Sequence, residues 1–235
     1  IKAVEWSSDN NYLLLKHEAG GTSEFILLDR KDPAKSVNLN KLFKVSPTLM
    51  SLKDKKVDFF YIYDQAKQTL AVGKLSTGQI DEPLLSDVLA YKSYGADLLI
   101  YVSDAVSKNG LVQTRIWDNG KTYKLSDTAA GSTYLIDAAK FQGQFYFVAG
   151  SNAGDRISVF KDPLNDLKNP SIAKANPFIT LHQSSTTKVS FSDNARFIAA
   201  EAGQNFVVYD LEAARYFHYT LSAPLTQELL WMDGH

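Results

Sequence analysis

The sequence predicts an all-β fold, a β-propeller with about five four-stranded blades plus the first strand of another. An aromatic residue, a polar turn and an apolar strand follow one another near both ends of the 235-residue chain, in Trp6–Leu13 and in Phe191–Ile198. Similar segments restart between these two at intervals of roughly 40–50 residues, which is the period of a propeller blade. Clean helical periodicity is missing, and β-branched and aromatic residues are frequent.

The repeated unit has at least three strands. Both strong copies continue into a further apolar strand that ends in aspartate, Phe25–Asp29 and Phe206–Asp210. Weaker copies of the opening pattern lie at Leu52–Tyr61, Tyr91–Ile100 and Ala139–Phe147, and a sixth start lies at Leu230–His235.

This register predicts which residues lie innermost in each blade. We expect innermost strands near Val4, Leu52, Leu89, Ile136, Val189 and Leu230. Trp6, Phe191 and Trp231 then occupy equivalent positions, and we expect them to be largely buried between blades.

Short turns separate the predicted strands. Asn119-Gly120 supplies the positive φ angles of a tight hairpin, and Gln142-Gly143 and Ser76–Gly78 are similar signals. Helix is expected only as a single turn at Leu211–Arg215. Residues 161–177 contain three prolines, which predicts a long loop in the fourth blade, followed by its outermost strand at Phe178–Leu181.

We expect a single domain over residues 1–235 that is incomplete and belongs to a longer chain. Propellers usually close when the two ends of the chain share one blade, and here an unfinished sixth blade would remain. The strand Glu228–Trp231 would then be an open edge through which copies could self-associate. No apolar run is long enough to span a bilayer, so we expect no membrane insertion by this segment.

Composition excludes several classes of function. With 25 basic and 26 acidic residues the net charge is −1, which gives no electrostatic attraction to nucleic acid or anionic lipid. Cysteine is absent, which excludes disulfides, thiolate zinc sites and thiol nucleophiles. No cofactor is expected.

No residue set predicts a catalytic or metal site. The four histidines, His17, His182, His218 and His235, do not have the spacing of metal ligands. Gly150–Gly154 contains Ser151 out of register with a nucleophile elbow and is interpreted as a polar hairpin loop. Asp162–Asp166 lacks the ligand pattern of a calcium loop, and turn aspartates more often cap backbone amides. Most members of a set of prominent tyrosines, which includes Tyr216 and Tyr219, are assigned to blade packing, and the rest are possible anchors for protein or glycan.

The blade openings and the strands that end in Leu28-Asp29, Trp117-Asp118 and Tyr209-Asp210 resemble those of WD40-like and TolB-like propellers. Val208–Glu212 is the best match, although the Gly-His pair of true WD40 repeats is missing from every blade. In its turn style the chain is also similar to propellers of bacterial envelope proteins that carry PEGA domains. The resemblance implies a cell-envelope, extracytoplasmic setting and no catalytic residues to carry over.

The sequence therefore favours a non-catalytic binding or scaffold module of a larger bacterial envelope protein, not an enzyme, whose loop face binds protein or glycan. No motif identifies the binding residues. One alternative is the gating propeller of a peptidase of the prolyl-oligopeptidase type, with catalysis on another domain. A second is a carbohydrate-binding or carbohydrate-cleaving propeller, and the alternative fold is a pair of β-sandwich sheets.

Overall fold

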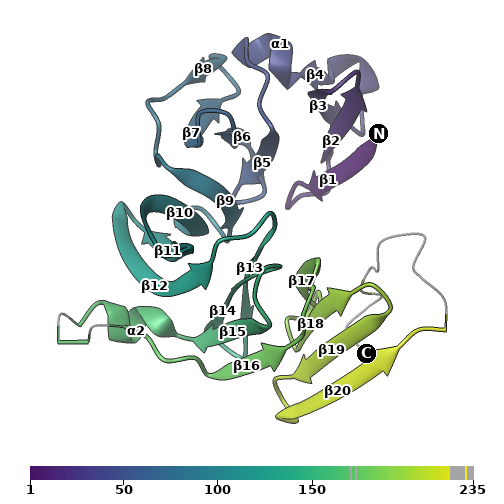
Figure 1. Ribbon diagram of the computed structural model, residues 1–235. Helices are drawn as coiled ribbons and strands as arrows, with labels where there is room; N and C mark the ends of the chain where they lie inside the picture. The colour runs from purple at the N-terminus through teal and green to yellow at the C-terminus, as the bar shows by residue number, and fades with distance from the viewer. Residues whose placement is uncertain (170, 173, 223–230, 232–235) are drawn as a thin grey trace. The chain divides into compact units, whose positions relative to one another are not determined.

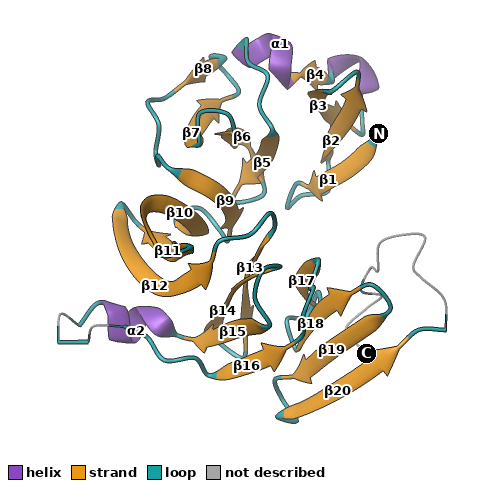
Figure 2. Ribbon diagram, in the orientation of Figure 1, coloured by secondary structure: helices purple, strands orange, loops and turns teal. Residues whose placement is uncertain are grey.

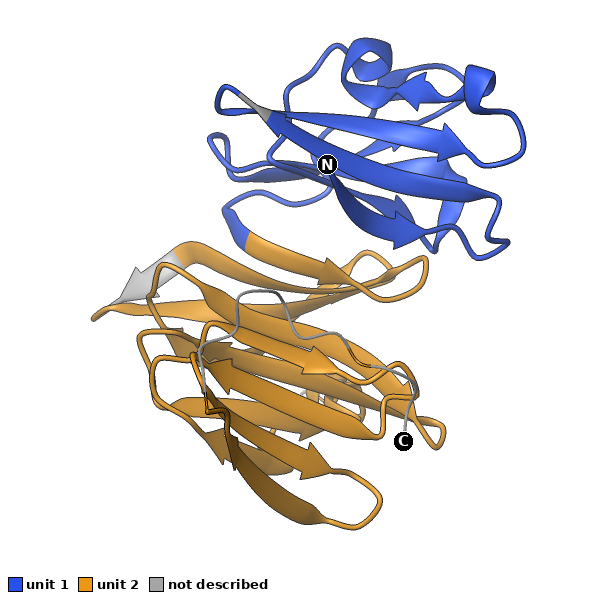
Figure 3. Cartoon of the chain, turned by 90° about the vertical axis from the view of Figure 1, so that its right-hand side faces the viewer, with its two compact units in different colours: residues 1–89 blue, residues 90–235 orange. Residues whose placement is uncertain are grey.

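The computed structural model describes residues 1–169, 171–172, 174–222 and 231, and its strands form five four-stranded antiparallel sheets (Figures 1 and 2). We name these sheets A to E in chain order. The chain divides into two compact units, residues 1–89 and residues 90–235 (Figure 3). The single domain expected over the whole chain stays a prediction.

Sheets A and B belong to the first unit. Sheet A consists of β1 (Lys2–Trp6), β2 (Tyr12–Ala19), β3 (Thr22–Asp29) and β4 (Val37–Asn38). Sheet B consists of β5 (Leu49–Lys53), β6 (Lys56–Asp64), β7 (Thr69–Lys74) and β8 (Gln79–Ile80). A 3-10 turn, η1 (Pro33–Lys35), precedes β4, and the short helix α1 (Leu39–Phe43) follows it.

Sheets C, D and E account for the rest of the chain. Sheet C consists of β9 (Val88–Ser93), β10 (Leu98–Lys108), β11 (Leu111–Asp118) and β12 (Lys121–Ala129). Sheet D consists of β13 (Tyr134–Phe141), β14 (Gln144–Ser151), β15 (Arg156–Lys161) and β16 (Ile179–His182), with the helix α2 (Pro163–Leu167) between its last two strands. Sheet E consists of β17 (Lys188–Phe191), β18 (Phe197–Ala202), β19 (Asn205–Asp210) and β20 (Arg215–Thr220).

Within every sheet the strands pair in chain order from first to fourth, which is the predicted blade topology. The five predicted innermost positions from Val4 to Val189 all lie in the first strand of a sheet. The structure has five separate four-stranded sheets, which contradicts the alternative fold, a sandwich of two face-packed sheets. Leu230, the sixth position, lies outside the described residues, as do Glu228 and Leu229 of the proposed open edge.

Within each unit, consecutive sheets bury apolar side chains between them. Leu14 and Phe25 of sheet A and Phe60 of sheet B share one fully buried cluster. In the second unit, one cluster joins sheets C and D, and another joins sheets D and E. Sheet D therefore has covered apolar side chains on both faces: Tyr146 and Val148 of β14 lie in one cluster, and Phe147 and Ala149 lie in the other. This explains why β14 is a nearly continuous apolar run rather than an alternating one.

The predicted turns are confirmed. Asn119 and Gly120 have φ angles of 48° and 83° in the β11–β12 hairpin, and Gln142 and Gly143 have 48° and 82° in the β13–β14 hairpin. The proline-rich segment connects the two outer strands of sheet D, and β16 follows it as the outermost strand, as predicted. The segment is not all loop, because it contains the helix α2.

The prediction of a single helical turn at Leu211–Arg215 was wrong, because Leu211–Ala214 form a hydrogen-bonded turn before β20. The two helices lie elsewhere. In α1, Asn38 caps the backbone N–H of Lys41, and Leu39 and Phe43 are buried on one side of the turn. Five residues are too few for a periodic sequence signal, and the cap and the buried pair form the helix locally.

The three equivalent aromatic residues differ in burial. Phe191 is 9% exposed and lies in the cluster between sheets D and E, as predicted. The prediction was wrong for Trp6, which is 44% exposed with the Arg30 guanidinium 5.4 Å from its ring centroid. Trp231 is half-buried, and its indole has partners in sheet E. The motif therefore specifies the position in the strand, while burial depends on what packs against the face.

Candidate functional site

The histidines lie on different strands and have different surroundings. His17 lies in β2, with its Nδ1 buried and without a hydrogen-bond partner among the described residues. His182 and His218 are exposed on the outermost strands β16 and β20, and His235 lies outside the described residues. Over the part of the chain that the structure describes, no three His, Asp or Glu side chains come close enough together to hold a metal ion.

Ser151 is the last residue of β14 and is 2% exposed, and its Oγ is buried without a partner among the described residues. The following loop joins β14 to β15, as the hairpin interpretation predicted. Asn152 holds this loop, because its side chain accepts from Thr133 N and donates to Ser132 Oγ. Ser151 is thus not presented to solvent as a hydrolase nucleophile must be.

The turn aspartates cap backbone amides, as expected. Asp162 Oδ1 accepts from Phe145 N at 2.7 Å. Asp29 Oδ1 accepts from the backbone N–H groups of Lys31 and Asp32, and Asp64 Oδ1 accepts from that of Lys67. These carboxylates stabilise the local fold.

A groove of about 440 Å³ lies at one end of sheet B in the first unit. We call it the loop groove. Three loop segments form its rim: residues 44–47 after α1, the β6–β7 turn, and residues 80–83 at the end of β8. Its apolar floor consists of Ile62, Ala71 and Ile80. Sequence motifs missed it because its residues come from three separate connections.

The rim is held by local hydrogen bonds. Lys44 has a left-handed φ of 56° at the end of α1, and it turns the chain toward β5. Thr48 N donates to Tyr63 O, and Gln65 N donates to Thr48 Oγ1, so the first loop is tied to the β6–β7 turn. A rigid rim of this kind preserves the shape of the groove without a ligand, which lowers the entropy cost of binding.

Positively and negatively charged side chains lie around the apolar floor. Lys67 Nζ lies 2.8 Å from Asp64 Oδ2, and this contact holds the pKa of the Asp64 carboxyl below its usual value. Lys44 and Asp81 line the groove as well. Apolar contact area with a few charged groups at the rim is the composition of a site that binds a peptide or another small polar ligand.

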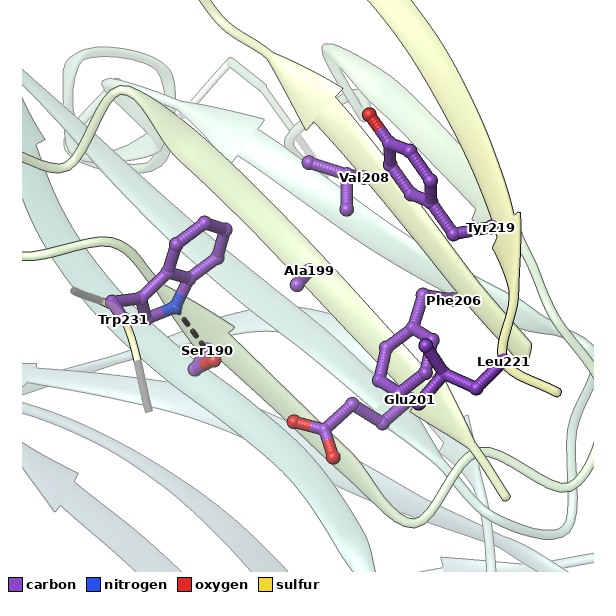
Figure 4. A pocket seen from close by; sticks show the side chains of 8 residues that line it. All are labelled: Ser190, Ala199, Glu201, Phe206, Val208, Tyr219, Leu221 and Trp231. Atoms are coloured by element: carbon purple, nitrogen blue, oxygen red, sulfur yellow. Dashed lines mark hydrogen bonds between the residues drawn. The ribbon is translucent and has the colours of Figure 1, made fainter. Parts of the chain in front are cut away.

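A second hollow, of about 250 Å³, lies on one face of sheet E (Figure 4). We call it the sheet-E hollow. Its lining is mostly apolar and comes from four strands and the residues after them: Ser190, Ala199, Glu201, Phe206, Val208, Tyr219, Leu221 and Trp231.

Trp231 lies at one side of the sheet-E hollow, across Ala199 from Val208 and Tyr219 (Figure 4). Its Nε1 donates to Ser190 Oγ at 3.1 Å, and its ring stacks on Phe197 with the centroids 6.1 Å apart. The backbone N–H of Phe191 donates to Asp137 Oδ2 of sheet D.

Comparison with known proteins identifies the fold. No protein-family model matches the chain, and no curated protein sequence matches it either. Among solved structures, Hsv2 of Kluyveromyces lactis matches with a TM-score of 0.53 and 9% identity, over 92% of this chain and 62% of that one. A chain of the mitotic checkpoint complex matches with a TM-score of 0.58 and 10% identity, over 94% of this chain and 64% of that one.

A chain of the nidogen/laminin complex matches with a TM-score of 0.55 and 11% identity, over 92% of this chain and 78% of that one. The chain spans less than two thirds of the length of the Hsv2 and checkpoint chains. At such low identity the likeness shows the fold alone: the chain has the all-β propeller fold, similar to that of WD40 propellers. The envelope setting and the PEGA association implied by the resemblance are not part of this finding.

Proposed function

We propose that the chain is a non-catalytic binding module that recognises protein segments in its loop groove. The observation that carries the proposal is the groove itself: an apolar floor within a hydrogen-bonded rim that bears Lys44, Asp64, Lys67 and Asp81. An extended peptide can place an apolar side chain on the floor and charged side chains against the rim. Because propeller sheets are rigid, loops at their ends are the natural place for recognition.

Some of the similar solved structures support a protein partner. Two similar chains come from protein assemblies, the mitotic checkpoint complex and the nidogen/laminin complex. Asp29, Asp64 and Asp162 cap turns, and Ser151 is buried, so these four residues do not favour a catalytic role.

We further propose that the module serves a larger bacterial envelope protein. The supporting observations are the absence of cysteine, which suits an exported bacterial protein as well as a cytoplasmic one, and the turn style shared with envelope propellers. Protease shaving of intact source cells, followed by detection with an antibody to this chain, tests the setting. Complete protection in intact cells together with release in the cytosolic fraction would contradict it.

The binding function is tested with a random 12-residue peptide library displayed on phage and selected on the purified chain. Enriched peptides are then measured by fluorescence polarisation against the wild type and two variants. Ala71→Arg places a long cation on the groove floor, and Ala213→Arg makes the same change on an exposed turn of sheet E. We expect at least about a tenfold loss of affinity for Ala71→Arg and none for Ala213→Arg.

Equal binding by both variants would place recognition elsewhere, and failure to enrich any peptide would contradict a peptide-binding function. Circular dichroism and thermal melting of Ala71→Arg establish that the variant is folded. A glycan array on the wild type distinguishes the carbohydrate-binding alternative, since specific glycan binding without peptide binding would replace the proposal.

A further inference from the structure

The outermost strand β20 differs from the other outermost strands. β4 and β8 have only two residues each, and β16 has four. β12 has nine, but Lys121, Lys124 and Asp127 place charges along it. β20 has six residues, Arg-Tyr-Phe-His-Tyr-Thr, every one of them exposed, with Arg215 as its only formal charge. Short length and edge charges protect a sheet edge from pairing with another chain. β20 is longer than β4, β8 and β16, and its one charge lies at its first residue.

The hydrogen-bond pattern identifies which groups of β20 face outward. Leu221 N donates to Gln204 O at 2.9 Å, so the bonded pairs of the β19–β20 ladder are Phe206–Tyr219 and Val208–Phe217. The intervening residues Tyr216, His218 and Thr220 direct their backbone N–H and C=O groups away from β19. None of these backbone groups has a partner among the residues that the structure describes.

We propose that β20 pairs antiparallel with β20 of a second copy of this chain, about a two-fold axis at His218. One pairing register gives hydrogen-bond partners to all the outward backbone N–H and C=O groups. In this register the backbone of His218 bonds to that of His218 in the other copy, and the backbone of Tyr216 bonds to that of Thr220 in the other copy. A closed two-fold interface uses the same patch on both copies, which a single edge strand provides.

Side-chain matching favours this register. The positions between the bonded pairs bring Phe217 of one copy opposite Tyr219 of the other, at the closest cross-strand spacing of about 4.5 Å between Cα atoms. Phe217 and Tyr219 already stack within one chain, with ring centroids 6.4 Å apart. The dimer thus extends this pair into a continuous row of four rings, and aromatic cross-strand pairs are among the favourable ones.

Charge also favours a second copy. Arg215 lies at the end of β20, opposite Leu221 of the other copy in this register, so the two arginines do not face each other. The pairing therefore requires no acidic partner segment, whereas an unrelated peptide would have no defined register on this strand. The interface lies on sheet E and is independent of the loop groove.

The absence of cysteine allows a direct test of the register. In a bonded antiparallel pair the Cα atoms lie about 5.5 Å apart, within the range of a disulfide. His218→Cys therefore places two thiols face to face across the axis. Thr220→Cys is the matched control on the same edge, because its symmetry mates lie about four residues, or roughly 13 Å, apart along the strands.

We expect the full chain to sediment as a dimer at high concentration, and His218→Cys to form a covalent dimer with oxidised glutathione while Thr220→Cys stays largely monomeric. His218→Lys opposes two ammonium groups at the axis and should weaken the dimer at least about tenfold, whereas His182→Lys on β16 should not. A monomer at all concentrations, or equal cross-linking at both positions, would overturn the proposal. Peptide pairing on a monomeric β20 would likewise replace it.

Discussion

Sheets A and E contain the same loop between their first two strands. Ser7 Oγ accepts from Tyr12 N at 2.9 Å, and Ser192 Oγ accepts from Phe197 N at 3.0 Å. Each serine also donates to the side chain two residues later, Asp9 in sheet A and Asn194 in sheet E. The similarity of the two sequence motifs is therefore a similarity of side-chain to backbone bonds, which form within six residues and need no neighbouring sheet.

The aromatic residues before these loops have opposite surroundings. Phe191 is buried in the cluster between sheets D and E, and Trp6 is exposed beneath Arg30. The two positions are equivalent in strand register, since Trp6 pairs with Leu13 and Phe191 pairs with Ile198. A repeat motif thus encodes loop geometry and register, whereas the contribution of its aromatic residue to stability depends on the packing against its face.

The largest expected difference between the sheets is the cost of losing this aromatic residue. Phe191→Ala should lower the free energy of unfolding by ~3–5 kcal/mol, because it removes a buried ring and leaves a cavity. Trp6→Ala is the matched control and should cost less than about 1 kcal/mol, since the ring is largely in water. Urea denaturation followed by tryptophan fluorescence and circular dichroism measures both.

A loss below about 1 kcal/mol for Phe191→Ala would mean that the D–E cluster tolerates a cavity or that the register is wrong. An equally large loss for Trp6→Ala would show that Trp6 is covered in solution. Either result would remove the contrast on which the comparison depends.

The second contrast concerns the aspartates that end β3 and β19. Asp29 Oδ1 accepts from two backbone N–H groups. Asp210 accepts from two as well, and its carboxylate also receives Arg196 Nε and Nη2 at 3.0 and 2.7 Å. The loop of sheet A has Asn11 where sheet E has Arg196, so the ion pair exists only in sheet E. The hydrogen bonds from Arg196 lower the pKa of the Asp210 carboxyl.

We expect Asp210→Ala to cost about 2–3 kcal/mol and Asp29→Ala about 1 kcal/mol, because a buried carboxylate with charged partners contributes more than one with neutral donors. The folded-state pKa of Asp210 is lowered, so its stabilisation is present above the unfolded pKa and is lost as pH falls through the folded value. Urea midpoints at pH 7 measure both costs. Equal losses of unfolding free energy would show that the hydrogen bonds from backbone N–H groups, and not those from Arg196, provide the stabilisation.

The sequence predicted the parts of the fold that depend on neighbouring residues. Turns such as Asn119-Gly120 and the openings at Trp6 and Phe191 have local signals, and together with three weaker repeats of the opening they located the first strand of all five sheets. The helix α1 escaped prediction because five residues show no period, and the exposure of Trp6 escaped it because burial is set by a different part of the chain.

The candidate sites were less predictable for the same reason. The loop groove combines Lys44, Asp64 and Asp81 from three connections that only folding brings together. The free edge at β20 did have a sequence signal, the run of four aromatic or imidazole side chains at 216–219. Such a run equally fits a buried strand, and only the position of β20 at the edge of sheet E decides between the two.

The smallest expected difference follows from one of the substitutions between the two loops, Asp9 in sheet A for Asn194 in sheet E. The Ser7 hydroxyl, followed by the Asn11 backbone N–H, lowers the pKa of Asp9 to about 2 from an ordinary value of 3.8. Because the folded-state pKa is depressed, this loop gains stability above pH ~4 and loses it as pH falls toward 2. The loop of sheet E has an amide at this position, which does not titrate. We therefore expect the amide NMR signals of Ser7 and Asn11 to shift with a midpoint near pH 2, while that of Ser192 stays constant. Asp9→Asn should abolish the titration and keep the loop hydrogen bonds, since Asn194 already makes them in sheet E.

A midpoint near 3.8 would mean that the Ser7 bond does not form in solution, and a matching titration at Ser192 would show that the two loops respond to a change elsewhere in the molecule.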